Sequence, residues 1–339
     1  MKFGGSSLES ADAIRNVADI IQSKQDKDPI VVLSAVAGVT DKLLDCIYAA
    51  LEGNAETAIE GISDIHEQHH EIADELDIAP EWRTLFDDTL DEYRNELQEF
   101  MTGAALVQNI STRSIDRMLP FGERYSTLLF VSYLNTIGMN AKLLDATEFI
   151  ITTNNHTKAV PLLEPSREKI EQAIPPVFEE GKLPIVQGFI GSAIDGAAIT
   201  TLGRGGSDYT ASIIGTALKT DEIQIWASVD GILTADPYVV PHAKVVERMT
   251  FREAAELAYF GARVLHPDSI LPAVEQDIPI HIYNSRNLES PGSLIRASFD
   301  GEEQSAVKSI AYKEDIKVIN LTSTRMFQAH DFLRKVFEV

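Results

Sequence analysis

Short apolar runs alternate along the chain with longer segments whose apolar residues recur every three to four positions. The run at 29–35 (PIVVLSA) is rich in β-branched residues and ends in small ones, which is typical of a buried parallel strand leading into a loop. The same criteria predict strands at 141–144, 184–189, 223–227 and 279–283, and helices at 41–53, 121–138, 167–178, 208–218, 251–259 and 269–276. This alternation indicates an α/β domain built around a mostly parallel sheet.

The segment from about 55 to 119 has a different pattern. It is rich in Glu, Asp, His and Gln, contains no strand-like run and keeps helical spacing, so we expect a helical insertion with a solvated acidic face. His66 and His70 are four residues apart and could share one helix face, and His69 lies between them. A solvated helix face is favoured over a metal site for these histidines, and no metal ligand is predicted.

The composition describes an acidic protein with one cysteine. Lys and Arg number 29 and Asp and Glu number 52, which gives a net charge of −23. Such a surface repels nucleic-acid phosphates and anionic lipid headgroups, so neither nucleic acid nor membrane is expected as a main partner. Cys46 cannot form an intramolecular disulfide and is expected to be buried as a small apolar residue. No run has the length of a membrane span or signal peptide, which favours a cytoplasmic enzyme.

Two glycine-rich segments carry candidate chemistry, and the first is KFGGSS at the start of the chain. Gly4 and Gly5 would let backbone N–H groups approach a phosphate, and Lys2 would supply charge to a transferring phosphoryl group. A following helix, capped by Ser7 or Ser10, would direct its positive end to the same place. The GxxxxGK[ST] spacing of a P-loop is absent, and an ordinary turn is the alternative for this segment alone.

The second segment, TLGRGGSDYT at 201–210, has three glycines within four positions around Arg204. Such a loop exposes N–H donors to an anion, and Arg204 offers its guanidinium fork to a carboxylate or phosphate. Asp208 could hold Lys2 in place or receive Mg²⁺ through water. The alternative is a glycine-rich hairpin in which Ser207 or Asp208 only caps the next helix.

A third motif, FGER at 121–124, places Glu123 at the start of a helix, where the dipole stabilises a carboxylate; alone it indicates only a cap. When its motifs are taken together and in their order, the chain resembles the amino-acid kinase family, and within it the aspartate kinases, from Lys2 to about Arg296. The segments that carry the resemblance are KFGGSS, VLSAVAGVT, FGER, QGFIG, TTLGRGGSDYTA, DGILTADP, ELAYFGARVLHP and PGSLI. The tail, with strands expected at 307–311 and 316–321 and a helix at 328–339, resembles the opening of an ACT regulatory domain.

This resemblance implies an organisation and an activity. A catalytic domain with an open, mainly parallel sheet between helices would span 1–300, with an amino-acid lobe and a nucleotide lobe meeting near 190–200, and a partial ACT domain would span 305–339. The reaction implied is L-aspartate + ATP → 4-phospho-L-aspartate + ADP, the entry step to lysine, threonine and methionine biosynthesis. Mg²⁺ would bind mainly through the nucleotide phosphates. A homodimer, and feedback by lysine or threonine at the ACT region, are also implied.

The resemblance further assigns roles to residues. Lys2 would be the catalytic lysine and Asp208 its partner. The substrate-binding residues would be Ser34, Thr40, Glu123, Arg204, Gly205, Gly206 and Ser207. The nucleotide-binding residues would be Lys2, Gly4, Gly5, Ser6, Ala227, Ser228, Gly231, Leu233, Asp236, Tyr238, Arg263 and Val264.

The nucleotide side departs from the family pattern at five positions. Ala227, Ser228, Leu233, Tyr238 and Arg263 stand where the family usually has Thr, Asp, Tyr, Arg and Lys. A lost charge-assisted hydrogen bond costs roughly 1.5–3 kcal/mol, so these replacements could weaken ATP binding. We expect an active aspartate kinase. Two alternatives stay open, a catalytically weak nucleotide or amino-acid sensor of the same fold and a kinase for another small carboxylate.

Overall fold

The architecture is a layered α/β fold around one large sheet. The structure is a computed structural model that describes residues 1–259, 265–299, 307–312, 316–317 and 319–320. The strand order is β3-β5-β2-β1-β8-β10-β11-β9, and every neighbouring pair is parallel except β10 with β11. The strands are β1 (Lys2–Phe3), β2 (Val31–Leu33), β3 (Ala141–Leu144), β5 (Leu183–Gln187), β8 (Ile223–Ala227), β9 (Arg248–Thr250), β10 (Ile280–Asn284) and β11 (Ser293–Arg296).

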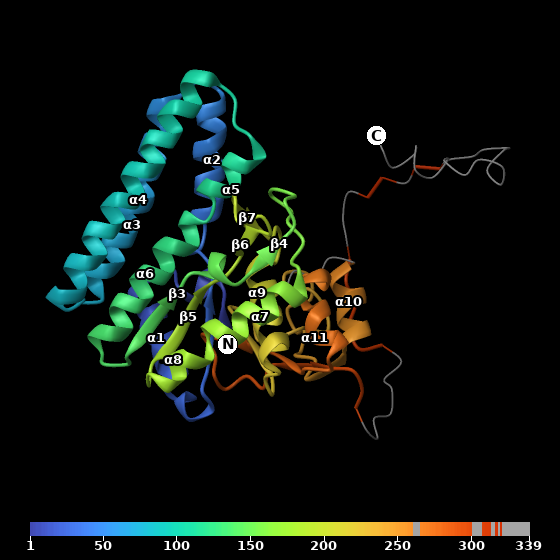
Figure 1. Cartoon of the computed structure of the whole chain (residues 1–339). Helices are drawn as coiled ribbons and strands as arrows, with labels where there is room; N and C mark the ends of the chain where they lie inside the picture. The colour runs from blue at the N-terminus through green and yellow to red at the C-terminus, as the bar shows by residue number, and fades with distance from the viewer. Residues whose placement is uncertain (260–264, 300–306, 313–315, 318, 321–339) are drawn as a thin grey trace.

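Two hydrophobic cores lie on the two faces of this sheet, with helices outside both (Figure 1). Successive side chains of a strand point to opposite faces, so Val31 and Leu33 enter one core and Val32 enters the other. The helices over the first face are α1 (Ala11–Gln22), α2 (Val39–Leu51), α3 (Ala55–Glu75), α4 (Pro80–Val107) and α6 (Phe121–Thr136). Those over the second are α7 (Leu163–Ala173), α8 (Pro175–Glu179), α9 (Gly206–Leu218), α10 (Phe251–Tyr259) and α11 (Leu271–Glu275). The predicted mainly parallel sheet between helices is confirmed.

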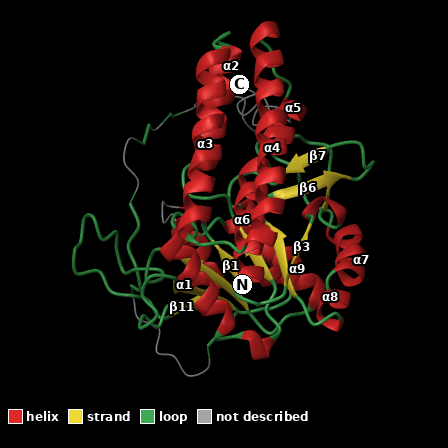
Figure 2. Cartoon of the chain, turned by 90° about the vertical axis from the view of Figure 1, so that its left-hand side faces the viewer, coloured by secondary structure: helices red, strands yellow, loops and turns green. Residues whose placement is uncertain are grey.

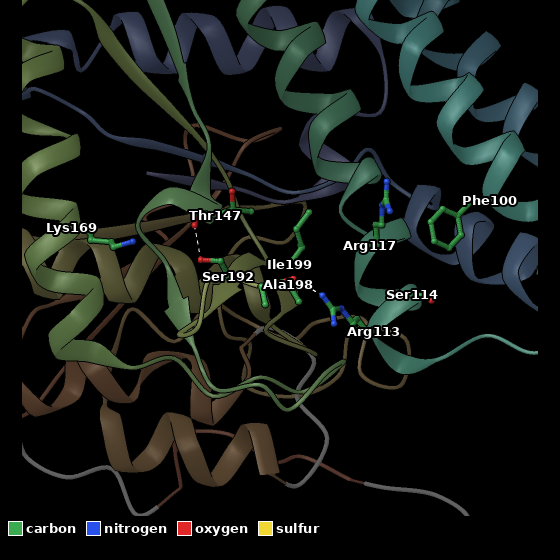
Figure 3. Close-up of a pocket in the computed structure, with 11 residues that line it drawn as sticks. Phe100, Arg113, Ser114, Arg117, Thr147, Lys169, Ser192, Ala198 and Ile199 are labelled. Atoms are coloured by element: carbon green, nitrogen blue, oxygen red, sulfur yellow. Dashed lines mark hydrogen bonds between the residues drawn. The ribbon is translucent and has the colours of Figure 1, made fainter.

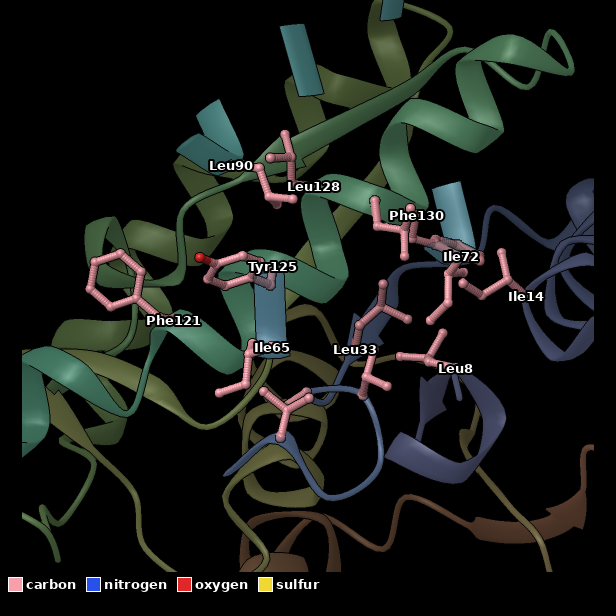
Figure 4. Close-up of a cluster of buried hydrophobic side chains, with 14 of the residues drawn as sticks. Leu8, Ile14, Leu33, Ile65, Ile72, Leu90, Phe121, Tyr125, Leu128 and Phe130 are labelled. Atoms are coloured by element: carbon pink, nitrogen blue, oxygen red, sulfur yellow. The ribbon is translucent and has the colours of Figure 1, made fainter. Parts of the chain in front are cut away.

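The first core joins the sheet to the helical insertion. Figure 4 shows Leu8, Ile14 and Leu33 near Ile72 of α3, with Ile65 of the same helix and Tyr125 of α6 on the other side of the cluster. The same buried cluster runs along the insertion, so the long helices are packed on the domain at their base. At the other end, the turn that joins α2 to α3 and the C-terminal end of α4 project together from the rest of the molecule (Figures 1 and 2).

The insertion is helical as predicted, with α5 (Thr112–Met118) after α3 and α4. The interpretation of its histidines as a solvated face is wrong. His66 is only 9% exposed and His69 is fully buried, because this face of α3 packs against α4 and α6. The His69 ring lies 4.9 Å from the ring of Tyr125, and burial lowers the pKa of His69 to about 4.

Several predicted boundaries shift for local physical reasons. Helix α2 begins at Val39 and is capped by Gly38 in the left-handed conformation (φ +80°), so Asp41 is not the cap. The helix predicted at 167–178 divides into α7 and α8 before Pro175, and that at 269–276 divides into a 3₁₀ turn and α11 before Pro272. Proline lacks the N–H that would continue the hydrogen-bond ladder of the preceding helical turn.

A small second sheet was not predicted. Strands β4 (Ile151–Thr152), β6 (Ile190–Ala193) and β7 (Ile199–Thr201) form it, with β4 parallel and β7 antiparallel to β6. Strands of two to four residues are too short to show a periodic pattern. Hairpin β6–β7 leads directly into the Arg204 loop, so this sheet positions the most distinctive segment of the sequence.

The tail differs from the prediction where it is described. Residues 307–311 form no strand; Ile310 N donates to Thr234 O (3.0 Å) and Ser309 Oγ to Leu233 O (2.6 Å). The strand predicted at 316–321 lies partly, and the helix at 328–339 wholly, outside the described residues. The ACT domain therefore stays a prediction. In the described part of the chain, no helix is both long and apolar enough to cross a membrane.

Candidate active site

The carboxyl ends of four parallel strands define the candidate site. Strand β1 pairs with β2 on one side and β8 on the other, and β2 pairs with β5. Gly4, Ser34, Gly188 and Ala227 therefore lie at the same edge of the sheet. Open α/β sheets bind their ligands in the crevice outside this edge.

Lys2 meets Asp208 at this edge. Lys2 Nζ lies 2.7 Å from Asp208 Oδ1, and the two side chains are 12% and 11% exposed. Asp208 Oδ1 is buried, and the ion pair with Lys2 is its one polar contact within the described residues. Asp208 belongs to the first turn of α9, where the positive end of the helix favours a carboxylate. The chain's second residue is thus fixed beside the glycine-rich loop.

Close backbone contacts explain the glycines around Ala35. A Cβ on Gly5 would lie 2.6 Å from Ala35 O, and one on Gly122 would lie 2.8 Å from Ala35 Cβ. Ala37 N donates to Gly5 O (3.2 Å), and Ala35 N donates to Glu123 Oε1 (3.2 Å). The KFGG segment, the loop after β2 and the start of α6 are therefore in direct contact.

Glu123 is a buried carboxyl group with unused hydrogen-bonding capacity. The residue is 4% exposed, and Oε2 has no hydrogen-bond partner in the described part of the chain. Burial raises the pKa of Glu123 to about 8, while the Ala35 N–H and the charge of Lys2 act in the opposite direction. A cationic ligand group at this place would stabilise the ionised form.

The Arg204 loop presents a free guanidinium group. Gly203 (φ +74°) and Gly205 (φ +71°) have left-handed conformations, which glycine adopts at least cost. Gly206 N donates to Gly203 O (3.0 Å) and closes the turn. Arg204 is exposed, and no hydrogen bond or ion pair joins it to another described residue. The loop is therefore shaped without using the arginine, which leaves it available to a ligand.

Three hydroxyl residues surround this region. Ser207 begins α9 with Asp208, and a Cβ on Gly188 would lie 2.5 Å from Ser207 Cβ, so β5 ends directly against this helix. Ser34 follows β2 and Thr40 lies in the first turn of α2; both are partly buried. Ser34 follows β2 at this edge, Ser207 packs against Gly188 at the end of β5, and Glu123 accepts a hydrogen bond from Ala35 after β2.

The loop after β8 is tied to the loop after β10. Ser285 N donates to Ala227 O (2.8 Å), and Asn284 Nδ2 donates to Asp230 Oδ1 (2.8 Å). Gly231 (φ +133°) lies so close to the start of β11 that a Cβ on Gly231 would be 2.5 Å from Ser293 Oγ. Sequence analysis did not identify Asn284 and Ser285, because no motif marks them.

The predicted nucleotide residues are only partly brought together. Gly4 N donates to Trp226 O (3.1 Å), so KFGGSS adjoins the end of β8 with Ala227 and Ser228. Asp236 and Tyr238 lie on an exposed turn, with Tyr238 97% exposed, and no described contact joins them to the glycine pair. Arg263 and Val264 lie outside the described residues.

Comparison with known proteins identifies the family to which this chain belongs. The profile described as "Amino acid kinase family" matches residues 1–284, which include β1, the Arg204 loop and Glu123. The chain belongs to the amino acid kinase family. Aspartokinase 3, chloroplastic, from Arabidopsis thaliana is 43% identical to it over 342 residues, which cover 99% of this chain and 59% of that protein. The chain thus spans less than two thirds of this curated relative.

Solved structures confirm the amino acid kinase fold. Aspartokinase III of E. coli in complex with aspartate and ADP (R-state) matches with a TM-score of 0.80 and 35% identity, over 88% of this chain and 64% of that chain. The same enzyme in complex with lysine and aspartate (T-state) matches with a TM-score of 0.78 and 32% identity, over 99% of this chain and 73% of that one.

This amino acid kinase also has a buried network that sequence analysis missed. Asp116 of α5 is fully buried; it accepts hydrogen bonds from Thr201 Oγ1 (2.6 Å) and Thr157 N (2.9 and 3.0 Å), and His156 Nδ1 lies 2.8 Å from it. A Cβ on Gly203 would lie 3.4 Å from Thr157 O. The network therefore fixes Thr157, against which Gly203 of the Arg204 loop packs. A single aspartate in a helical insertion carries no sequence signal for such a role.

The same amino acid kinase has a basic cavity of about 570 Å³ beside α5, lined by Phe100, Arg113, Arg117 and Lys169 (Figure 3). Arg117 is paired with Glu96 (2.8 Å). None of the predicted site residues that the structure describes lines this cavity. Lys2 and Asp208 meet at the edge of the sheet, apart from this cavity.

Proposed function

We propose that this amino acid kinase transfers the γ-phosphate of ATP to the β-carboxylate of L-aspartate, giving 4-phospho-L-aspartate and ADP. The observation that carries the proposal is the ion pair of Lys2 with Asp208 beside the buried carboxyl of Glu123 and the free Arg204. An ammonium group, a buried carboxyl group that a substrate cation would ionise, and a guanidinium group near one sheet edge match the charges of a phosphoryl group and an amino acid. The relative from Arabidopsis is named an aspartokinase, which supports the same substrate.

The substrate would be oriented by complementary charges. Arg204 would bind the α-carboxylate with its two-pronged guanidinium, and the unpartnered Oε2 of Glu123 would receive the α-ammonium group. Ser34, Thr40 and Ser207 would donate hydroxyl hydrogen bonds. The N–H group of Gly205 would meet an anionic oxygen at the start of α9, and Gly206, whose own N–H closes the turn, would let that oxygen approach the backbone. The β-carboxylate would then be directed towards Lys2.

Phosphoryl transfer requires positioning and charge neutralisation more than covalent chemistry. Lys2 would neutralise charge on the transferring group. The backbone N–H groups of Gly5 and Ser6 would bind the phosphates, and Gly4, whose own N–H donates to Trp226 O, would let them approach closely. Asp208 would hold the ammonium group of Lys2 in place and so act as a positioning residue. The nucleotide would enter as its Mg²⁺ complex, with the ion held mainly by the phosphates.

The adenosine side would be formed by the loop after β8, with Ala227, Ser228, Gly231 and Leu233, and by Asp236, Tyr238, Arg263 and Val264. E. coli aspartokinase III was solved with ADP, which supports a nucleotide site in this fold. The exposure of Ser228 and Tyr238 favours, as a second candidate, a catalytically weak sensor of the same fold. Calorimetry with Mg·ATP separates the two, since absence of binding at millimolar nucleotide favours the sensor.

The organisation of the protein is part of the proposal. Residues 1–300 would form the catalytic domain, with the two lobes meeting near 190–200, and 305–339 would begin an ACT domain. An E. coli aspartokinase III was solved with lysine, which supports feedback by lysine, with threonine as the alternative effector. Homodimer formation and a cytoplasmic location complete the proposal.

Coupled release of ADP tests the activity. The chain is assayed with aspartate, with glutamate and without acceptor; turnover should require aspartate and should be lost in Lys2→Ala. Lys182→Ala is the matched control, because Lys182 is an exposed lysine paired with Glu180 (2.8 Å) away from the site. Equal rates with all three acceptor conditions would contradict the substrate assignment, and full activity of Lys2→Ala would contradict the site.

A further inference from the structure

Three possible metal ligands meet between the two long helices of the insertion. His66 and His70 lie one turn apart on α3, and Asp91 lies on α4. His66 Nε2 is 3.3 Å from His70 Nε2 and 3.0 Å from Asp91 Oδ1. The three ligand atoms all lie within 4.8 Å of one another. Two imidazole nitrogens and a carboxylate oxygen thus point into one small space.

We propose that His66, His70 and Asp91 form a binding site for a divalent transition-metal ion, with zinc as the preferred ion. Zinc takes imidazole nitrogen and carboxylate oxygen at about 2.0–2.2 Å in a tetrahedron. Neighbouring ligand atoms of such a tetrahedron are about 3.3 Å apart. The two short separations of the cluster are close to this value without movement of the helices, and solvent would supply the fourth ligand.

The surroundings support a cation at this position. His70 Nδ1 lies 3.3 Å from Asp87 Oδ1 and 3.2 Å from Arg83 Nη2. A carboxylate on the second ring nitrogen can orient a metal-binding histidine. Asp74 and Asp87 pair with Arg83, and Asp91 Oδ1 pairs with Arg94 Nη2 at 2.9 Å. A metal ion would therefore take the place of Arg94 as the charge partner of this oxygen. The Asp91 side chain is 52% exposed, which gives an ion access from solvent, while the His66 side chain is 11% exposed.

A metal ion bound at this site would link α3 to α4. His66 and Asp91 are separated by 25 positions along the chain, so a shared ion closes the turn between α3 and α4. His69 takes no part, since its Nδ1 bonds to Ile65 O (2.7 Å) and its ring packs on Tyr125. The site is separate from Lys2 and Asp208, so its role would be structural and independent of phosphoryl transfer.

Titration of the tag-free, chelator-treated whole chain with Co²⁺ tests the proposal. A tetrahedral site should give intense visible absorption at one Co²⁺ per chain, and Zn²⁺ should displace it and raise Tm. Asp91→Asn and His70→Ala should weaken binding at least tenfold, and Asp87→Asn by roughly 10–100-fold. Glu71→Gln, a change at an exposed carboxylate on the same helix, should bind as the wild type does.

The proposal is overturned if Co²⁺ gives only the weak spectrum of an octahedral ion, or if Asp91→Asn binds with wild-type affinity. Circular dichroism shows whether each variant is folded. Asp91 is half exposed, so its variant carries the test even if His70→Ala fails to fold.

Discussion

Ala35 N donates a hydrogen bond to Glu123 Oε1 at 3.2 Å, and this is the only hydrogen bond that either carboxylate oxygen receives from another residue of the described chain. The contact joins the end of β2 to the first turn of α6. One backbone donor does not replace the water that the buried carboxylate has lost, so the pKa of Glu123 rises to about 8. Two predictions follow from this burial.

The first concerns stability against pH. Between pH 4.5 and about 8 the folded protein keeps the Glu123 proton while the unfolded chain loses it. The contribution of this group to the free energy of unfolding is therefore fully present below pH 4.5 and falls as pH rises, by at most about 1.4 kcal/mol per unit. Glu123→Gln should lack this decline. Urea unfolding at several pH values measures it, with Glu67→Gln, a change at an exposed carboxylate, keeping the wild-type slope. A pH-independent difference between wild type and Glu123→Gln would refute the assignment.

The second concerns proton release. If the substrate ammonium group binds at Glu123, its charge lowers the pKa of the carboxyl, so aspartate binding near pH 7 should release a proton. Calorimetry in buffers of different ionisation enthalpy measures this release. Glu123→Gln should abolish it and weaken binding. A binding enthalpy that does not depend on the buffer would argue against the proposed contact.

Asp208→Asn should uncouple Lys2 from α9. The substitution removes the charge partner of an ammonium group whose side chain is 12% exposed, which should lower the free energy of unfolding by about 1–3 kcal/mol. A misplaced lysine should lower kcat on the order of 100-fold. Denaturation and coupled ADP release measure the two effects. In the control Asp12→Asn, the lost ion pair with Arg15 is solvent-exposed, and stability should change by less than about 0.5 kcal/mol.

Gly188→Ala should disturb the start of α9. The added Cβ would lie 2.5 Å from Ser207 Cβ and 2.9 Å from Ser207 Cα, so the helix must shift at a cost of about 1–3 kcal/mol. Ser207 and Asp208 would move with it, so activity should fall together with Tm. Gly103→Ala is the control: Gly103 lies in α4 with open space around it, and alanine there should stabilise by about 0.5–1 kcal/mol. Unchanged activity of Gly188→Ala would contradict the packing argument.

Local chemistry explains which parts of this protein could be predicted. Strands 141–144 and 223–227 have the predicted bounds. The run at 223–227 is apolar apart from Gln224, which fits a strand buried on both faces. The segments around Lys2 and Arg204 could be found because glycine and charge are dense within a few positions. The role of Asp116 could not be predicted, because its three hydrogen-bonding partners lie far from it along the chain and no motif connects them.

The sequence by itself determined the strand and helix pattern, the glycines that permit close backbone contacts, and the charged side chains offered near them. Only the tertiary structure decided which of those charges meet. Parallel pairing beside β1 brings Lys2 to Asp208, and packing of α3 against α4 and α6 buries histidines expected in solvent. The reason is physical: propensity and spacing act within a few residues, whereas burial and ion pairing depend on which surfaces the whole chain brings into contact.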